Sequence, residues 1–243
     1  MKNIFARFWA LWGMITFIAT FLIIFLPSMA CYLIPDPKSA AIFRKISKIW
    51  MTVWLFLVGC PVRVKGEANF KKDKAYIVTC NHNALLDVPL SSPFIPGPNK
   101  TIAKKSFTKV PLFGWYYRKG SVLVDRNSDA SRRASIIEMR KVLALGIHMC
   151  IYPEGTRNRS ADPLKKFYDG AFKLAVDTKT SVIPTLIFNT RKAMPIHKTF
   201  YLLPVRLELH FLEAVSPEGL RADQLKEKVY QIMWDHYAAH ARP

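Results

Sequence analysis

The sequence predicts an α/β domain that follows apolar, membrane-associated helices at the N-terminus. Two contrasting patterns lead to this fold class. Residues 8–35 contain no charged side chain. After Arg63, short apolar runs alternate with amphipathic stretches, as strands alternate with helices in α/β proteins. We therefore divide the chain into an N-terminal anchor of residues 1–62 and an α/β domain of residues 63–243.

The first apolar run, residues 8–26, is long enough to cross a membrane. As a helix it would span roughly 28 Å, close to the thickness of the hydrocarbon core of a bilayer. Pro27 is expected to break or kink this helix. The alternative is a cleaved signal peptide, because residues 28–30 loosely resemble a small-residue cleavage site. The apolar run is longer than a usual signal core, which favours an anchor that is retained.

A second apolar stretch, residues 49–62, is too short to cross a bilayer alone. We expect it to lie in one leaflet or to pack on the first helix. The segment between the two apolar stretches reads as a basic connector suited to anionic lipid headgroups, formed by Lys38, Arg44, Lys45 and Lys48. Side chains that favour the membrane interface occur in both stretches, at Trp9, Trp12, Trp50 and Trp54.

The net charge of +19, from 36 basic and 17 acidic residues, predicts an anionic partner. Nucleic acid, an anionic membrane surface and a phosphorylated substrate all fit the charge. The apolar first sixty residues and the lack of a helix-turn-helix or zinc-finger signature argue against nucleic acid. The four cysteines occur singly, without a C-x-x-C pair, so we expect neither a zinc site nor a disulfide framework.

In the α/β domain, short apolar runs predict strands at residues 75–80, 121–124, 147–152 and 182–188. Apolar residues spaced by three and four predict helices at residues 129–145 and 170–177, and a last helix containing Leu225, Val229 and Ile232. Residues 205–211 alternate strictly, which predicts a half-exposed strand with Arg206, Glu208 and His210 on one face.

Candidate catalytic residues follow the first of these strands. His82 would lie at the carboxyl end of strand 75–80, where open α/β sheets place their sites. Asp87, five residues later, could accept the Nδ1 proton of His82 and leave Nε2 as a base. On its own, this pair is as consistent with a structural histidine as with a catalytic one. Cys80 is the one plausible covalent nucleophile nearby, although its side chain ends a strand that we expect to be buried.

Candidate anion-binding residues follow the strand at 147–152. Arg157 can hold a phosphate through two parallel hydrogen bonds, and Glu154 can hold that guanidinium in place. Gly155 allows close approach of the backbone to an anion, and Thr156 completes this group. Further basic residues lie between the two constellations, at Lys104, Lys105, Lys109 and Arg126. The alternatives are an ordinary turn with a surface ion pair, and a solvated basic face.

Taken in order, these residues resemble the 1-acylglycerol-3-phosphate acyltransferase family. His82 to Asp87 fits its H-x4-D motif, and residues 120–126 fit its glycine-to-arginine motif. Residues 154–157 fit its E-G-T-R motif, and residues 182–184 fit its proline-containing fourth motif. The resemblance covers about residues 61–190. Relatives often carry a basic residue before the glycine where this chain has Tyr168-Asp169-Gly170, which puts the lining near Gly170 in doubt.

The resemblance implies an α/β fold with a mixed central sheet flanked by helices. It implies that His82 and Asp87 form a catalytic dyad and that Lys105, Arg126 and Arg157 bind the phosphate of the acceptor. Since a thioester is already activated and no G-x-S-x-G elbow is present, no acyl-enzyme is required. His82 would deprotonate the sn-2 hydroxyl of lysophosphatidic acid as it attacks the thioester, giving phosphatidic acid.

We expect no cofactor and no metal, only acyl-CoA or acyl carrier protein as the donor. An acyltransferase or transacylase for another lysophospholipid or an amino lipid would share the same dyad. A basic membrane adaptor without activity would explain the charge and the apolar segment, but it leaves the ordered motifs unexplained. We expect the N-terminal helices to be inserted in the membrane and the catalytic domain to lie on its cytoplasmic face.

Overall fold

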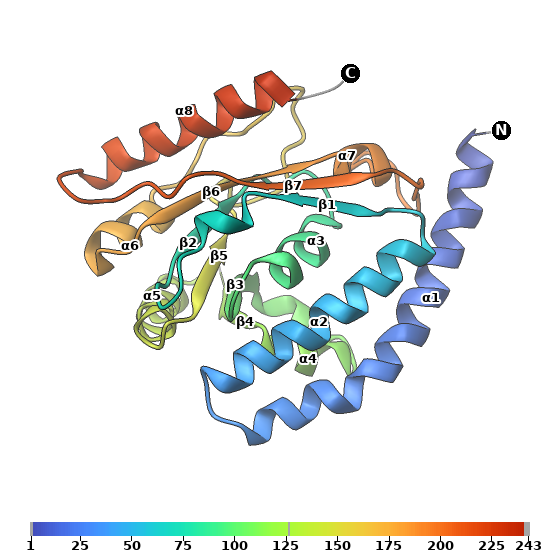
Figure 1. The fold of residues 1–243 in the computed structure, drawn as a ribbon. Helices are drawn as coiled ribbons and strands as arrows, with labels where there is room; N and C mark the ends of the chain where they lie inside the picture. Colours follow the sequence, from blue (N-terminus) through green and yellow to red (C-terminus); the bar gives the residue numbers. More distant parts are fainter. Residues whose placement is uncertain (1, 126, 241–243) are drawn as a thin grey trace.

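A mixed sheet forms the centre of the molecule (Figure 1). Within residues 2–125 and 127–240, which the computed structural model describes, seven strands pair in the order β1-β7-β6-β2-β5-β3-β4. Strands β4, β3, β5, β2 and β6 are mutually parallel, and β7 runs antiparallel to β6 and parallel to β1. The bounds are β1 Val62–Lys65, β2 Ile77–Cys80, β3 Asn99–Lys104, β4 Ser121–Val124, β5 His148–Ile151, β6 Val182–Phe188 and β7 Leu207–Phe211.

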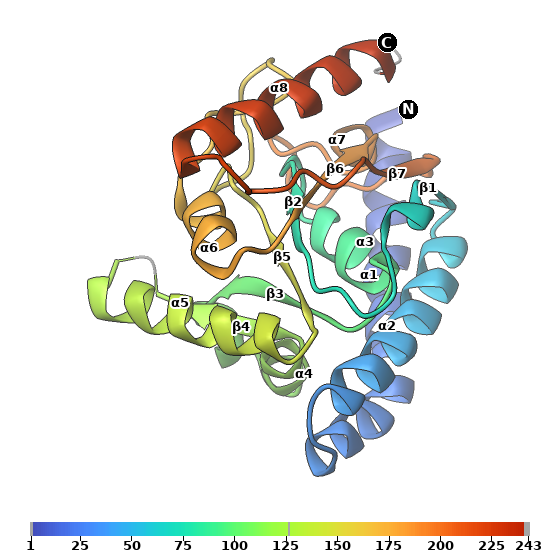
Figure 2. The same cartoon turned by 60° about the vertical axis from the view of Figure 1, so that its left-hand side comes forward.

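Helices cover both faces of the sheet. Figure 2 shows one group of helices, α1 to α4, on the opposite side of the sheet from α5, α6 and α8. The first group comprises α1 Lys2–Ala30, α2 Lys38–Leu57, α3 Asp87–Phe94 and α4 Phe113–Lys119. The second comprises α5 Asp129–Ala144, α6 Gly170–Thr178 and α8 Ala222–His240. Single turns complete the chain at η1 Cys31–Leu33, η2 Glu67–Asn69, η3 Lys105–Lys109 and α7 Thr190–Ala193. The predicted α/β class with a mixed sheet flanked by helices is confirmed.

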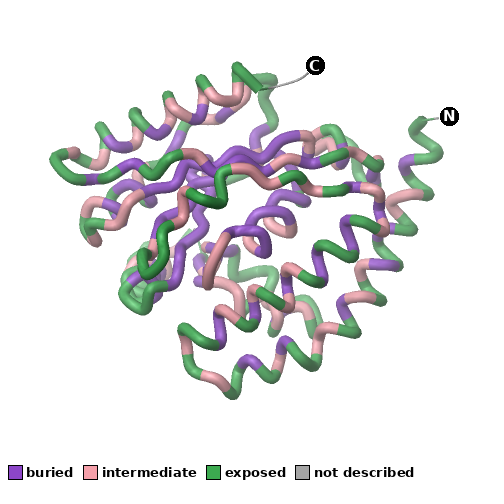
Figure 3. Tube along the Cα trace, viewed as in Figure 1, coloured by how far each residue is buried: buried purple, intermediate pink, exposed green. Residues whose placement is uncertain are grey.

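Two apolar cores hold these layers together, one on each face of the sheet. The buried strands run through the centre of Figure 3, and the outer helices present exposed residues. Residues that alternate along a strand point to opposite faces, so Ile77 joins the core under α5, α6 and α8, and Val78 joins the core under α1 to α3. The N-terminal helices share that second core, because Trp50, Trp54 and Leu55 pack with the strand residues.

The first two helices form an antiparallel hairpin that indole groups hold together. Trp54 Nε1 donates to the carbonyl of Gly13 at 3.0 Å, and Trp50 Nε1 donates to Thr20 Oγ1 at 2.9 Å. Trp9 and Trp12 donate to carbonyls at the end of α2 and just beyond it. The packing of the second apolar stretch on the first helix is therefore confirmed. The sequence predicted that these tryptophans favour the membrane interface. In the structure their indoles also join the two helices.

Two local expectations about the hairpin were wrong. The expected break at Pro27 does not occur: helix α1 continues through this residue to Ala30, because a proline in the last turn removes only one intrahelical hydrogen bond, and a kink there stays a prediction. The basic residues of the supposed connector belong to α2, which begins at Lys38, eleven residues before the apolar stretch. Their side chains therefore project from a helix and not from a loop.

The outward face of the hairpin is apolar. Ile23 and Leu26 on α1 are each 74% exposed, and Phe56 on α2 is 77% exposed. By length and composition, the segment Lys2–Leu33 is long and apolar enough to cross a membrane. An exposed apolar helix of this kind indicates membrane association. The division at residue 62 stays a prediction, since the helices and the sheet share one core.

The strands predicted from apolar runs all occur, with ends that differ by at most two residues. The strand over 205–211 corresponds to β7, but the prediction that its polar face is exposed was wrong at one position. His210 is 3% exposed, because its ring packs against Phe188 and its Nδ1 lies 2.9 Å from Nε2 of His236 on α8. The C-terminal helix covers a face that the alternating pattern alone leaves open.

Candidate active site

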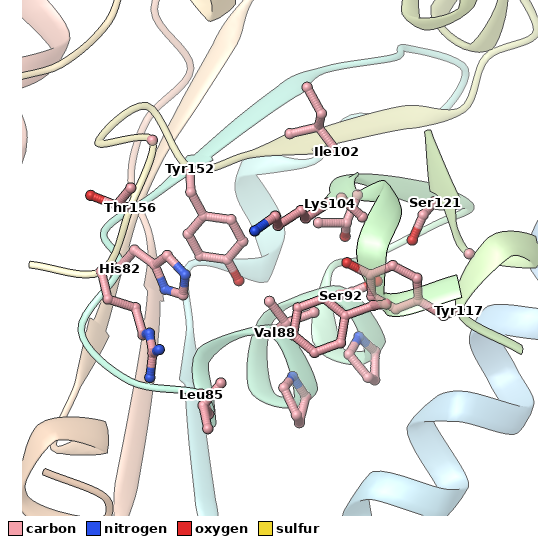
Figure 4. Close-up of a pocket in the computed structure, with 18 of the residues that line it drawn as sticks. His82, Leu85, Val88, Ser92, Ile102, Lys104, Tyr117, Ser121, Tyr152 and Thr156 are labelled. Carbon is pink, nitrogen blue, oxygen red and sulfur yellow. The ribbon is translucent and has the colours of Figure 1, made fainter. Parts of the chain in front are cut away.

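Three neighbouring parallel strands end at one edge of the sheet and bring the candidate residues together. His82 follows β2, residues 154–157 follow β5, and Lys104 ends β3. Strand β5 pairs with β2 on one side and with β3 on the other, so their carboxyl ends lie side by side. In Figure 4, His82, Lys104, Tyr152 and Thr156 surround one end of a cavity. The two constellations predicted from the sequence therefore form one site.

The predicted dyad is formed. His82 Nδ1 lies 2.8 Å from Asp87 Oδ2, and the Asp87 side chain is fully buried. The same oxygen accepts the backbone N–H of Asn83 at 2.5 Å and that of Ala84 at 2.7 Å. Asp87 begins α3, where the positive end of the helix favours a negative charge. With Nδ1 held by Asp87, Nε2 is the nitrogen that remains for a substrate in the cavity.

Glu154 supports the dyad and does not line the cavity. Its Oε1 accepts the backbone N–H of His82 at 2.8 Å, and its Oε2 accepts the N–H of Lys165 at 3.2 Å. Burial raises the pKa of the Glu154 carboxyl from 4.5 to about 7, against the lowering effect of these two hydrogen bonds. Both oxygens are directed at backbone amides, so this carboxylate positions His82. That contact replaces the expected role of holding the guanidinium of Arg157.

Gly155 is required by its backbone conformation and by a neighbouring ring. Its φ is +71°, and a Cβ placed there would lie 2.8 Å from Cε2 of Tyr168. The expected approach of an anion to this backbone is therefore limited by Tyr168 on that side. Thr156 is exposed at the cavity, and its Oγ1 accepts a hydrogen bond from Lys165 Nζ at 2.8 Å. Lys165 thus joins the site from eleven residues beyond Glu154.

Cationic side chains gather at the same end of the cavity. Arg157 lines it as predicted, and Lys104 extends toward Tyr152 in Figure 4. Lys105 begins η3 and is exposed outside the cavity lining, so the lysine that faces the site is Lys104. The family resemblance gave this role to Lys105, whereas in the structure its neighbour Lys104, the last residue of β3, lines the cavity. Arg126, the other predicted phosphate ligand, lies outside the described residues.

The cavity has a volume of about 920 Å³ and changes character along its length. Its polar end is lined by His82, Lys104, Arg157, Arg159 and Lys165. Its far end lies against the N-terminal hairpin and α4 and is lined by Phe17, Phe43, Trp50, Met51, Phe113 and Tyr116. A single cavity with a cationic end and an apolar end suits an amphiphile that carries a phosphate and an acyl chain.

Cys80 is a poor nucleophile. Its side chain is fully buried, with its Sγ 3.9 Å from the Sγ of Cys150. Burial raises the pKa of the Cys80 thiol well above its ordinary value, which disfavours the reactive thiolate. The geometry supports His82 as the reactive group. Among the described residues, no group of three or more His, Cys, Asp or Glu side chains is arranged to hold a metal ion.

Sequence reasoning missed Asn158, which joins the two active-site loops. Its side chain is fully buried, and its backbone N–H donates to the carbonyl of His82 at 2.6 Å. Its Oδ1 accepts hydrogen bonds from the N–H and the Oγ of Ser160, which fixes the turn after Arg157. An asparagine directly after the E-G-T-R motif was the only available signal, and one asparagine in a turn is not specific.

Comparison with known proteins shows the family of this chain. The family described as Acyltransferase matches residues 61–188. A 1-acyl-sn-glycerol-3-phosphate acyltransferase from Saccharomyces cerevisiae is 30% identical over 194 residues, which cover 73% of this chain and 61% of that protein. One from Borreliella burgdorferi is 33% identical over 137 residues, covering 56% of this chain and 54% of that protein. This chain thus spans between about half and two thirds of the length of these relatives.

The fold also has a counterpart among solved structures. The crystal structure of the 1-acyl-sn-glycerophosphate (LPA) acyltransferase PlsC from Thermotoga maritima superposes with a TM-score of 0.80 at 28% sequence identity. The match covers 100% of this chain and 99% of that one, so it includes the N-terminal hairpin as well as the sheet. The arrangement of the hairpin against the sheet is therefore shared between the two proteins.

Proposed function

Since this chain belongs to the acyltransferase family, we propose that it transfers a fatty acyl group from a thioester donor to the sn-2 hydroxyl of 1-acylglycerol 3-phosphate. The product is phosphatidic acid, an intermediate of phospholipid synthesis. The dyad of His82 and Asp87 at the cationic end of an amphiphile-sized cavity carries this proposal. The names of the relatives from yeast and Borreliella support the choice of acceptor.

The dyad performs the chemistry by general-base catalysis. Nε2 of His82 takes the proton of the acceptor hydroxyl while the oxygen attacks the thioester carbonyl. Asp87 stabilises the imidazolium that forms and keeps the ring in the productive tautomer. The C–S bond then breaks, the new C–O ester bond remains, and the imidazolium returns its proton to the thiolate that leaves. The residues of this chain thus move one proton between two substrates.

The cationic end of the cavity holds the phosphate of the acceptor. Arg157 offers a planar fork of donors, and Lys104 and Lys165 add two further positive charges close by. A phosphate bound there places the glycerol hydroxyl beside His82. The apolar end then receives an acyl chain, in contact with side chains from α1, α2 and α4. The thioester carrier is coenzyme A or an acyl carrier protein.

The apolar hairpin gives the enzyme access to its lipid substrate. We infer that α1 and α2 insert their exposed apolar face into one leaflet and that the sheet domain lies on the cytoplasmic side. Lys38, Lys45 and Lys48 on α2, together with the net charge of +19, favour an anionic membrane surface. Because the cavity reaches the hairpin, an acyl chain in the bilayer lies close to the apolar end of the site.

One experiment tests the proposed reaction. Purified protein is incubated in mixed micelles with lysophosphatidate and either acyl-CoA or acyl carrier protein thioester, and lipid products are read by mass spectrometry. Phosphatidic acid should form with at least one donor. Acylation of another lysophospholipid or an amino lipid in preference to lysophosphatidate would contradict the acceptor. No acyl transfer to any acceptor would leave the basic membrane adaptor as the better interpretation.

A further inference from the structure

Arg191 lies outside the motifs that carry the family resemblance, yet it contacts both active-site loops. It belongs to α7, which follows β6, the strand that pairs with β2 on the side away from β5. Asn81 ties β6 to the start of the His82 loop, because its side chain exchanges hydrogen bonds with the backbone N–H and carbonyl of Ile187 at 2.7 and 3.0 Å. The end of β6 is therefore held at a fixed place beside the site.

The guanidinium of Arg191 donates hydrogen bonds to three oxygens on two loops. Its Nη1 donates to the carbonyl of Ser160 at 2.9 Å, and its Nη2 donates to the carbonyl of Asn158 at 3.2 Å. Nη2 also lies 3.3 Å from Oδ1 of Asn83. Ser160 and Asn158 belong to the loop that carries Arg157, and Asn83 belongs to the loop that carries His82. One planar cation thus bridges the phosphate-binding loop and the catalytic loop.

These contacts reach the reacting groups within one further step. The backbone N–H of Asn83 donates to Asp87 Oδ2, the oxygen that also holds His82 Nδ1. The backbone N–H of Asn158 donates to the carbonyl of His82. Arg191 itself is absent from the cavity lining, so it does not touch a substrate bound there. Its contacts act on the distance between the base and the cationic end of the site.

We propose that Arg191 is a positioning residue for acyl transfer, which sets the spacing between His82 and the phosphate-binding Arg157 loop. The proposal rests on the proposed function for its catalytic consequence, but the bridge between the loops does not depend on the reaction. A lysophosphatidate held by its phosphate presents its hydroxyl to Nε2 only if the two loops keep this spacing, because a displacement of about 1 Å can cost about 100-fold in rate.

The test compares Arg191→Ala and Arg191→Lys with Arg140→Ala. Arg140 is a matched control, since it is an arginine paired with Asp177 on the other face of the sheet. Arg191→Ala should lower kcat/KM for lysophosphatidate by about 10- to 100-fold per folded molecule, with a lower kcat and a higher KM. Arg191→Lys should recover part of the loss, because it keeps the charge but not the planar fork. Arg140→Ala should stay within about twofold of wild type.

Hydrogen–deuterium exchange gives a second readout that is independent of the reaction. Amides of residues 81–87 and 155–162 should exchange about tenfold faster or more in Arg191→Ala, and at the wild-type rate in Arg140→Ala. If Arg191→Ala exchanges faster than wild type but the wild-type protein shows no acyl transfer, the proposed function is refuted and the bridge is retained. Unchanged exchange in both segments, or a folded Arg191→Ala with kcat/KM within threefold of wild type, would overturn the inference. If Arg191→Ala does not fold, Asn83→Ala removes one arm of the bridge and should show the same two effects at smaller size.

Discussion

Glu154 couples the stability of the protein to pH. Its carboxyl has a pKa of about 7 in the folded protein and an ordinary value of 4.5 when exposed to water. The folded state therefore binds a proton that the unfolded state has released between these two values. The resulting stabilisation is fully present below pH 4.5 and is lost as the pH rises through 7, and it amounts to at most about 3 kcal/mol.

Glu154→Gln removes this titration and should flatten the pH dependence of the unfolding free energy between pH 4.5 and 7. The variant should also be less stable overall, because an amide offers only one acceptor to the two backbone N–H groups of His82 and Lys165. Denaturant titrations at several pH values measure both effects. Glu138→Gln, at an exposed position on α5, is the control. If the unfolding free energy of Glu154→Gln changes with pH as steeply as that of wild type, the Glu154 carboxyl does not titrate as described.

The dyad gives the strongest prediction for activity. His82→Ala should lower kcat by about 10² to 10⁴, the usual contribution of a general base. Asp87→Asn should also cost orders of magnitude, because an amide cannot hold the imidazole in the same tautomer. Steady-state assays with lysophosphatidate measure both losses, and near-ultraviolet circular dichroism checks the fold. A folded His82→Ala enzyme within a factor of about three of wild type would rule out the proposed base.

Arg157 should select for the phosphate of the acceptor. Arg157→Ala should reduce kcat/KM for lysophosphatidate by about 30- to 150-fold, the effect of losing one charge-assisted contact. Arg157→Lys keeps the charge but loses the fork, so it should still be impaired. The loss should be much smaller for an uncharged monoacylglycerol, which has no phosphate. Equal losses on the two acceptors would mean that Arg157 supports the loop and not the phosphate.

At the scale of elements, the hairpin of α1 and α2 depends on buried indole contacts. Trp54→Phe removes the hydrogen bond to the carbonyl of Gly13 in a buried setting and should destabilise the protein by about 1 kcal/mol. Trp12→Phe removes an equivalent bond to the carbonyl of Leu57, the last residue of α2, from a side chain that is 44% exposed, where water at the membrane interface can replace it. Thermal unfolding in detergent should therefore show a lower Tm for Trp54→Phe and little change for Trp12→Phe. An equal decrease in Tm for the two variants would show that burial of the indole does not determine how much its hydrogen bond stabilises the protein.

The predictable elements are those whose apolar runs are long. Strands β5 and β6 are buried at every position, so their sequences are nearly continuous apolar runs. Strand β3 was not predicted, because its buried face includes Asn99 and Thr101 and its sequence lacks an apolar pattern. Helix α3 was not predicted either, since it has only eight residues and contains Pro93.

The same distinction applies to the site. His82 and Asp87 are five residues apart, so a local motif reveals them. Lys104 and Arg191 reach the site only because β3 and β6 are neighbours of β5 and β2 in the sheet. Strand order is a property of the tertiary fold, and it cannot be inferred from the spacing of residues along the chain. Sequence patterns therefore predict the reactive pair better than the residues that hold it in place.

For the molecule as a whole, the exposed face of the hairpin should determine membrane binding. Ile23→Glu and Leu26→Glu replace two side chains that are each 74% exposed, so the fold should survive while vesicle binding weakens by roughly 10- to 100-fold for each lost apolar contact. Ile137→Glu is the matched control, because Ile137 is 55% exposed on α5, on the opposite side of the sheet. Sedimentation with anionic vesicles at high salt measures the difference. Binding that the hairpin substitutions leave intact would place the membrane contact elsewhere.

These substitutions test the membrane anchor more sharply than removal of residues 1–60 does. Trp50, Trp54 and Leu55 pack in the same core as strands β2 and β7, so truncation exposes the apolar side of the sheet. The truncated chain should lose stability as well as its membrane anchor. All the motifs lie after residue 80, so the truncated chain keeps the residues needed to act on acceptor dispersed in detergent. It should show this activity only if the remaining sheet stays folded.

The pairing of β1 with β7 also has a consequence for biosynthesis. Val62 follows the hairpin directly, yet its partner in the sheet is Leu207, so the ribosome must extend the chain through about β7 before the N-terminal segment finds its place. Until then the inner faces of α1 and α2 lack part of the strand residues that cover them, namely those of β6 and β7. A nascent chain in this state is prone to aggregate. Early contact with the bilayer would shield these helices, so the proposed membrane contact would serve this protein during its synthesis as well as during the proposed reaction.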